Sequence, residues 1–163
     1  MPGGIAASHG WLAALRAWLL VMGSGNLLWE AAHLPLYTIW RTGTWRENAF
    51  AVVHCTGGDL LIATASLTLA LLLAGHGVWP ARRFGAVAAL TMAFGVGYTA
   101  FSEWLNIVVR ASWAYSEHMP VVRLGDFELG LSPIAQWIIV PLLAFAWARR
   151  SAPCRSKADE AGA

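Results

Sequence analysis

Hydrophobic positions fall into four long runs that are separated by short polar breaks. The runs extend over about 12–34, 48–74, 83–110 and 132–148. A helix needs roughly 20 mostly apolar residues to cross about 30 Å of hydrocarbon. The pattern therefore predicts an all-α integral membrane protein, with a single domain over 1–150 that is a bundle of four transmembrane helices.

The breaks carry the residues that end and begin helices. Pro35 follows the first run, and Gly75 and Pro80 follow the second. Ser132 is a candidate N-cap for the fourth helix, with Pro133 at the first helical position. The longest connection, 111–130, is predicted as a loop that covers one mouth of the bundle.

Composition agrees with a protein in lipid. Hydrophobic residues make up 58% of the chain and charged residues 12%, against roughly 25% charged residues in soluble domains, and the mean hydropathy is +0.55. The basic residues lie at helix ends and do not gather on one face, which argues against nucleic acid as a partner. With Arg16 as the only basic residue near its start, the first run is expected to be a retained helix and not a cleaved signal peptide.

The distribution of basic residues predicts the orientation. The N-terminal region, the second connection and the tail hold seven Lys and Arg residues, whereas the other two connections hold four. The excess places both termini in the cytoplasm, so that 151–163 is expected to be a short disordered cytoplasmic tail. The seven are Arg16, Arg82, Arg83, Arg149, Arg150, Arg155 and Lys157, and the four are Arg41, Arg46, Arg110 and Arg123.

Polar and ionisable residues recur at helical spacing in two of the runs. Asn26, Glu30 and His33 share one face of the first helix, and Glu103 and Asn106 share one face of the third. The other helices and the aromatic neighbours of the first set add further candidates. These are His54 and Asp59 in the second helix, Gln136 in the fourth, and the aromatic neighbours Trp29, Tyr98 and Trp104.

These groups are expected to lie in the same half of the bilayer. At a rise of 1.5 Å per residue, Glu30 comes roughly 6 Å from its helix end, Glu103 roughly 10 Å and Asp59 roughly 16 Å, all on the side opposite the termini. A charge in hydrocarbon costs at least about 2.5 to 3.5 kcal/mol. The ionisable groups should therefore face one another or water, in a pocket that opens to the outer leaflet.

A structural role is the alternative for several of these residues. Asn, Gln, Ser and Thr often do no more than join helices, and this reading suits Asn26 and Gln136 taken singly. Trp residues are common at membrane interfaces. Five ionisable groups exceed what packing requires, which favours a functional pocket built on Glu30, His33, His54, Asp59 and Glu103.

The first functional hypothesis is an enzyme that uses acid and base groups on a lipophilic substrate. A carboxyl such as Glu30 or Glu103 in a dry pocket can hold a proton and deliver it, while another carboxylate or a histidine accepts one. Aromatic faces would stabilise a cationic intermediate. Isomerisation or cyclisation of an isoprenoid- or sterol-like molecule, without a cofactor, fits this chemistry.

The second hypothesis is a metal- or haem-binding protein. Glu30 and His33 form a Glu-x-x-His element, of which di-iron bundles use two, but the equivalent positions of the third helix are Glu103 and Asn106. Two alternatives are left: a transition metal held by Glu30, His33 and His54, or one haem between the two histidines.

The third hypothesis is a non-catalytic accessory or assembly subunit of a membrane complex, which the small size of the chain favours. The expected partners are therefore a membrane lipid or a hydrophobic small molecule, and a homo-oligomer or a larger membrane complex stays open. A channel through the membrane is not favoured, because the inner halves of the helices are almost purely apolar.

Five stretches carry a family resemblance: NLLWEAAHLPLYTIW (26–40), HCTGGDLLIA (54–63), SEWLN (102–106), WAYSEHMP (113–120) and LSPIAQW (131–137). They resemble a family of small, uncharacterised four-helix bacterial membrane proteins, over most of the chain from Asn26 to Trp137. The resemblance implies a multi-pass protein of the bacterial inner membrane. It implies no activity, cofactor or catalytic residue.

Overall fold

The computed structural model describes residues 3–151, and four long helices dominate them. They are α1 (Gly3–His33), α3 (Trp45–Ala74), α4 (Phe84–Trp104) and α5 (Leu131–Ser151). Together with the turns that continue α1 and α4, all four are long and apolar enough to cross a membrane. The predicted all-α bundle of four membrane-spanning helices is confirmed, while the predicted tail lies almost wholly outside the described residues.

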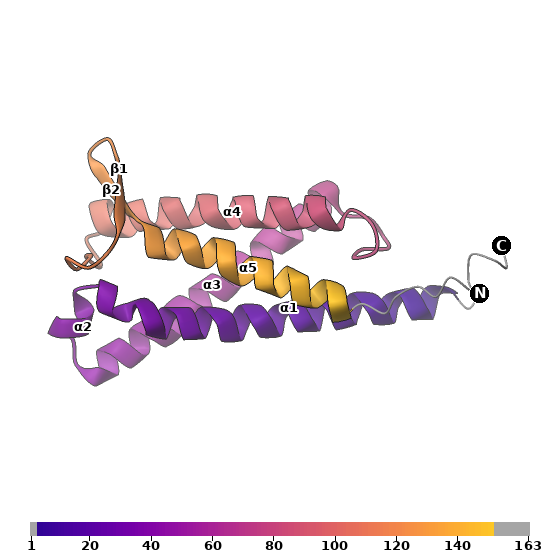
Figure 1. The fold of residues 1–163 in the computed structure, drawn as a ribbon, viewed down its shortest axis with the longest axis horizontal. Coiled ribbons are helices and arrows are strands. Elements are labelled where there is room, and N and C mark those ends of the chain that lie inside the picture. The colour runs from indigo at the N-terminus through magenta and orange to yellow at the C-terminus, as the bar shows by residue number, and fades with distance from the viewer. Residues whose placement is uncertain (1–2, 152–163) are drawn as a thin grey trace.

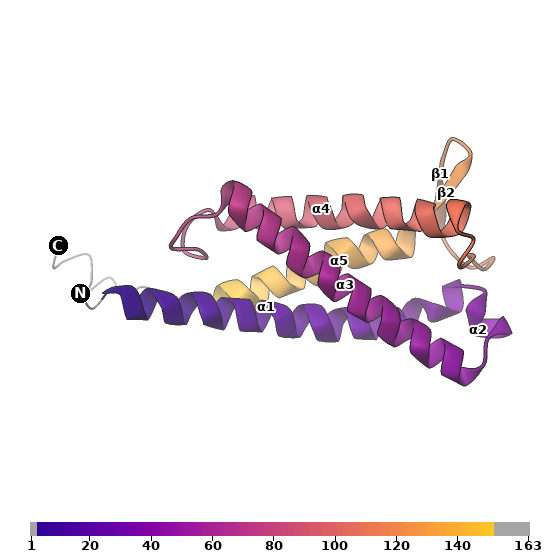
Figure 2. The same ribbon diagram turned by 180° about the vertical axis from the view of Figure 1, so that it is seen from behind.

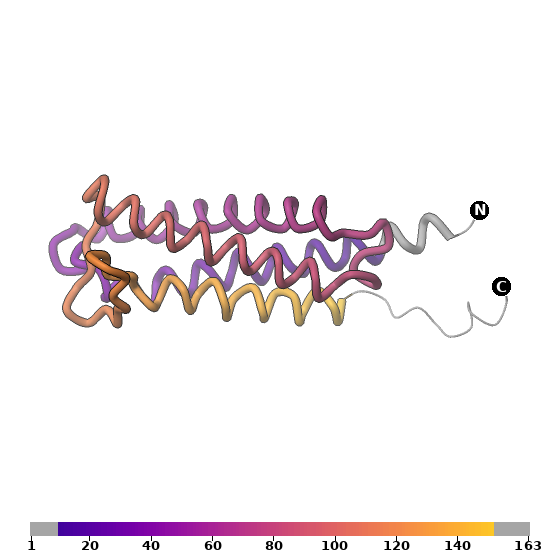
Figure 3. The backbone as a smooth tube through the Cα atoms, turned by 90° about the horizontal axis from the view of Figure 1, so that it is seen from above, coloured from indigo at the N-terminus to yellow at the C-terminus, as the bar shows by residue number. Residues whose placement is uncertain are grey.

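The four helices pack in a closed ring. Helix α1 packs against α5 and α3, and α4 packs against the same two neighbours, as Figures 1 and 2 show from opposite sides. Seen from above, the bundle is elongated and the helices run along its long axis (Figure 3). The start of α1 and the end of α5 lie together, and we call this the terminal end of the bundle.

The opposite end, which we call the hairpin end, carries the more elaborate connections. After α1 the chain makes a 3₁₀ turn, η1 (Leu34–Leu36), and the short helix α2 (Ile39–Thr42). Helix α3 then begins in a capping box: Thr44 and Glu47 bond reciprocally, each side chain to the backbone of the other. The helix therefore begins at Trp45, three residues before the predicted beginning at Asn48.

The connection over 111–130, predicted as a loop, contains a β-hairpin. Strands β1 (Val121–Leu124) and β2 (Phe127–Gly130) pair antiparallel, with Leu124 opposite Phe127. The two-residue turn begins at Gly125, whose φ of +64° is a conformation that glycine adopts readily. A π-helical turn, η2 (Leu105–Val109), precedes this connection and continues α4.

The predicted N-cap role of Ser132 is wrong. Helix α5 begins at Leu131, directly after β2, so Ser132 is already inside the helix. Its hydroxyl lies 3.0 Å from the His33 ring and accepts a bond from the Trp29 indole. The fixed end of the hairpin sets the start of the helix, and the serine is free to bond across to α1.

The apolar core fills the terminal half of the bundle. Its buried members include Trp18 on α1, Trp137 and Phe145 on α5, and Leu67 on α3. Helix α4 comes close to α5 at Gly95, where an added Cβ would lie 2.1 Å from the Trp137 ring. The polar groups described below lie in the other half of the bundle, towards the hairpin end.

Candidate functional site

The amide nitrogen of Gln136 on α5 is the centre of one polar network. It lies 3.0 Å from the side-chain oxygen of Asn26, 3.0 Å from a carboxylate oxygen of Glu30 and 2.9 Å from one of Asp59. The network thus joins α1, α3 and α5. An amide group has only two hydrogens to donate to these three oxygens, so two carboxyl groups from different helices compete for it.

His33 extends this network towards the hairpin end. Its Nε2 lies 3.1 Å from the second carboxylate oxygen of Glu30, and its Nδ1 lies 3.0 Å from the hydroxyl of Ser132. The Trp29 indole donates to the same hydroxyl at 3.2 Å. Both ring nitrogens of His33 are therefore engaged. We call these seven residues the Glu30 network: Asn26, Trp29, Glu30, His33, Asp59, Ser132 and Gln136.

Glu103 on α4 forms a second network with two tyrosines. The Tyr115 and Tyr37 hydroxyls both donate to the same carboxylate oxygen, the latter at 3.5 Å. The backbone N–H of Gly130 donates to the Tyr115 oxygen at 2.9 Å, which ties this tyrosine to the hairpin. We call Glu103, Tyr37 and Tyr115 the Glu103 network.

Backbone bonds between two connections place the tyrosines. Tyr37 and Tyr115 form an isolated antiparallel β-bridge. The N–H of Thr38 donates to the carbonyl of Ala114 at 3.0 Å, and that of Ser116 to the carbonyl of Leu36 at 2.8 Å. Segments almost 80 residues apart in the chain are thus held side by side above the carboxyl of Glu103.

Burial and nearby charge act on both tyrosines. Desolvation, followed by the proximity of Glu103, raises the pKa of Tyr37 well above its usual value. The pKa of Tyr115 is also raised, first by burial and then by its bond to the Glu103 carboxylate. Both hydroxyls therefore stay protonated at neutral pH and act as donors.

The two networks meet at an aromatic contact. The His33 and Tyr37 rings are 5.4 Å apart between centroids and cross at 68°, an edge-on arrangement. The side chains that carry the networks are well buried: Asn26 is 1% exposed, Gln136 2%, Glu103 6% and Glu30 8%. In the part of the chain that the structure describes, the carboxyls of Glu30, Asp59 and Glu103 have no Lys or Arg partner.

Four of the candidate residues lie apart from these networks. His54 is exposed and stacks on Phe50 at the surface of α3. Tyr98 and Trp104 are 51% and 42% exposed on the outside of α4. Asn106 donates to Ser102 in the preceding turn of its own helix. Tyr98 and Trp104 are exposed because they lie off the face of α4 that carries Glu103, and His54 is exposed because it lies off the face of α3 that carries Asp59.

The ligand set suggested for a metal or haem is not assembled. Glu30 and His33 come together, but His54 points to the surface. Within residues 3–151 no three His, Cys, Asp or Glu side chains gather so that they could hold a metal ion. The side chains of the Glu30 network are instead bonded to an amide and a hydroxyl.

The sequence analysis did not predict Tyr37, Tyr115 or Ser132 as residues of the site. All three lie in the connections at the hairpin end or at a helix start, where periodicity gives no information. A faint signal was present, because Tyr37 follows the Glu-x-x-His element by four residues and so comes one turn beyond His33.

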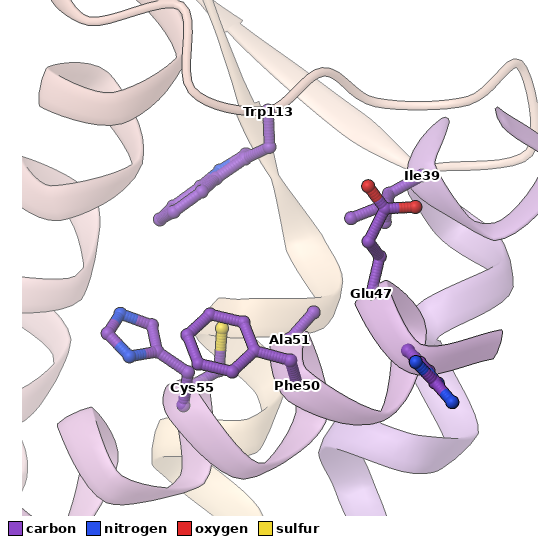
Figure 4. Close-up of a pocket in the computed structure, with 8 residues that line it drawn as sticks. Ile39, Glu47, Phe50, Ala51, Cys55 and Trp113 are labelled. Atoms are coloured by element: carbon purple, nitrogen blue, oxygen red, sulfur yellow. The ribbon is translucent and has the colours of Figure 1, made fainter. Parts of the chain in front are cut away.

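An apolar pocket of about 370 Å³ opens beside these networks, at the start of α3. In Figure 4 the Trp113 ring lies on one side of the space, and Phe50, Ala51 and Cys55 lie on the other. Cys55 is one helical turn before Asp59 and on the same face of α3. The inner end of the pocket therefore reaches towards the Glu30 network.

Comparisons with models of protein families, with curated proteins and with solved structures gave no match.

Proposed function

We propose that this protein is a membrane-embedded acid–base enzyme that moves a carbon–carbon double bond in a lipophilic, isoprenoid- or sterol-like molecule. The observation that carries the proposal is the presence of two separate hydrogen-bond networks, one around Glu30 and one around Glu103, that meet at the contact between His33 and Tyr37. Isomerisation needs one group that gives a proton and another that takes one.

The Glu30 network is suited to give the proton. Glu30 and Asp59 share the amide group of Gln136, and two carboxylates so close together in a site shielded from water repel each other unless one holds a proton. His33 bonds to Glu30 and can return a proton to it. This pairing of acids matches the use of coupled carboxyl groups in acid–base enzymes.

The Glu103 network is suited to take the proton. Its carboxylate receives two O–H bonds from tyrosines that stay protonated at neutral pH. In the proposed step, a proton adds to one alkene carbon, a C–H bond next to the resulting cation breaks, and its electron pair forms the shifted double bond. The proton goes to Glu103, so that atoms and electrons balance without an oxidant or a reductant.

The setting that suits this chemistry is the inner membrane of a bacterium, with both termini in the cytoplasm and the hairpin end outside. The excess of basic residues at the terminal end supports this orientation. The apolar pocket at the start of α3 supports a lipophilic substrate, because it would admit a molecule at the level of the outer leaflet.

Activity on membrane lipids tests the proposal. The protein in nanodiscs is incubated with a neutral lipid extract of a bacterial membrane and with defined sterol and prenol alkenes, and isomers are sought by chromatography and mass spectrometry. We expect Glu30→Gln and Glu103→Gln to lose at least about a hundredfold in turnover, and Glu128→Gln, on the exposed hairpin, to keep it. Full activity in the first two variants would refute the proposal.

A further inference from the structure

The pocket beside α3 carries charge at its outer end and aromatic rings along its length. We infer that it binds a single-chain, unsaturated amphiphile with an anionic head group, of the prenyl phosphate kind. The inference rests on the proposed function in naming the class of molecule that reaches the acid–base site, but the binding itself does not require the reaction.

The charge at the outer end comes from Arg46. Its guanidinium lies 5.5 Å from the centroid of the Trp45 ring, and no carboxylate pairs with it in residues 3–151, where the described ion pairs of arginine are those of Arg41 and Arg123. An unpaired guanidinium presents two parallel N–H donors, which fit phosphate or carboxylate oxygens. The outer end of the pocket is therefore complementary to an anion.

The carboxylate of Glu47 does not pair with Arg46. It also lines the pocket, but it accepts bonds from the backbone N–H of Thr44 at 2.7 Å and from the Thr44 hydroxyl at 2.8 Å. It is thus held at the positive end of the α3 dipole, which offsets part of its charge. Arg46 remains free to bind a head group.

The walls of the pocket suit an unsaturated chain. Phe50 and His54 stack with ring planes 17° apart, and the Trp113 ring lies across the space from Phe50 (Figure 4). Flat carbon–carbon double bonds pack against such aromatic faces. A volume of about 370 Å³ lies near the lower limit of ligand pockets, which is enough for one chain.

Direction and depth agree with delivery to the acid–base site. From Arg46 to Cys55 the helix rises roughly 14 Å, so a head group at Arg46 places the chain along α3 towards its interior. Asp59 follows Cys55 by one turn and is bonded to Gln136. The double bonds nearest the inner end would thus come closest to the Glu30 network.

Equilibrium binding of radiolabelled farnesyl phosphate to the protein in phosphatidylcholine nanodiscs tests the inference. We expect saturable binding, and binding of farnesol that is at least about tenfold weaker because it lacks the charge. Arg46→Gln should weaken binding of the phosphate by a similar factor, Arg46→Lys should restore part of it, and Ala51→Phe should abolish it by filling the pocket. The matched control, Arg123→Gln, removes an exposed arginine elsewhere and should change nothing.

Several outcomes would overturn the inference. Equal binding of farnesol and farnesyl phosphate would remove the head-group role of Arg46, and competition by vesicles of phosphatidic acid as strong as that by farnesyl phosphate would show a general anionic-lipid surface. Unchanged binding in Ala51→Phe would place the ligand elsewhere. Binding without any turnover would instead contradict the proposed function alone, and turnover unaffected by all pocket variants would contradict this inference alone.

Discussion

A single side-chain amide, that of Gln136, holds oxygen atoms from two other helices. Asn26 and Glu30 come from α1 and Asp59 comes from α3, and all three lie within 3.0 Å of the same nitrogen. In hydrocarbon a buried oxygen that loses its donor is costly. Gln136 therefore joins helices and also brings two carboxyl groups together, so the structural and the chemical interpretation of this residue are compatible.

Replacing Gln136 by Leu should destabilise the bundle. The change leaves buried acceptors without a donor, which costs about 1–3 kcal/mol, and thermal unfolding in detergent should show the lower stability. Asn106→Leu is the matched control, because Asn106 donates only to Ser102 in its own helix and should cost clearly less. Equal losses in the two variants would contradict the central place of Gln136.

The two tyrosines of the Glu103 network should resist ionisation. In a Tyr98→Phe background only Tyr37 and Tyr115 remain, and their raised pKa values predict almost no tyrosinate absorbance at pH 10, where the unfolded chain is about half ionised. Because the folded state keeps these protons, their contribution to stability is complete below about pH 10 and is lost as the pH rises further. Absorbance equal to that of the unfolded chain would contradict the burial of both hydroxyls.

At the residue scale, the sequence predicted the network members that lie on helices better than those in connections. The spacing of Asn26, Glu30 and His33 places them on one face, and the structure brings all three into one network. His54 lies outside both networks because two residues of the same helix can share a depth and still point in different directions. Tyr37 and Tyr115 depend on a backbone bridge between distant segments, which local patterns do not encode.

Among the elements, α4 and α5 approach each other closely at Gly95. The backbone of Gly95 touches the Trp137 ring, next in sequence to Gln136, and an added Cβ would lie 2.1 Å from a ring carbon. The glycine therefore sets how near α5 can bring Gln136 to the other helices.

Gly95→Ala should push α4 and α5 apart. We expect a loss of about 1–3 kcal/mol in stability from overpacking, together with reduced turnover because the Glu30 network is displaced. Gly97→Ala, two residues further on α4, meets nothing within 4 Å and should leave stability the same or slightly higher. Thermal unfolding of the two variants side by side measures the difference. If Gly95→Ala unfolds at the same temperature as the unmodified protein, the close packing of the two helices is contradicted.

Helices were predicted well at this scale and strands were not. Apolar runs of about 20 residues specify membrane helices almost independently of context, and all four were found. The hairpin was missed although its sequence contains the signal: Gly125 and Asp126 stand between Leu124 and Phe127, a two-residue glycine turn between apolar positions. Its position, however, depends on Gly130 and Tyr115, which meet only in the folded chain.

For the whole molecule, the proposed orientation can be tested with reporter fusions. With both termini cytoplasmic, green fluorescent protein fused after Ala163 should fluoresce in a bacterial host, and alkaline phosphatase fused there should be inactive. Alkaline phosphatase inserted between Gly125 and Asp126, at the hairpin turn, should be active. The opposite pattern would show that the protein has the opposite orientation, with the pocket in the inner leaflet.

The most direct test of the account is isomerisation in heavy water. If separate groups give and take the proton, the new C–H bond of the product receives its hydrogen from the Glu30 network, which exchanges with solvent. We therefore predict one solvent deuterium per product molecule with the unmodified protein, and none above background with Glu30→Gln or Glu103→Gln. Lipids that return unlabelled and unchanged from the unmodified protein, or product that forms without deuterium, would contradict the claim that these two networks are the proton donor and acceptor.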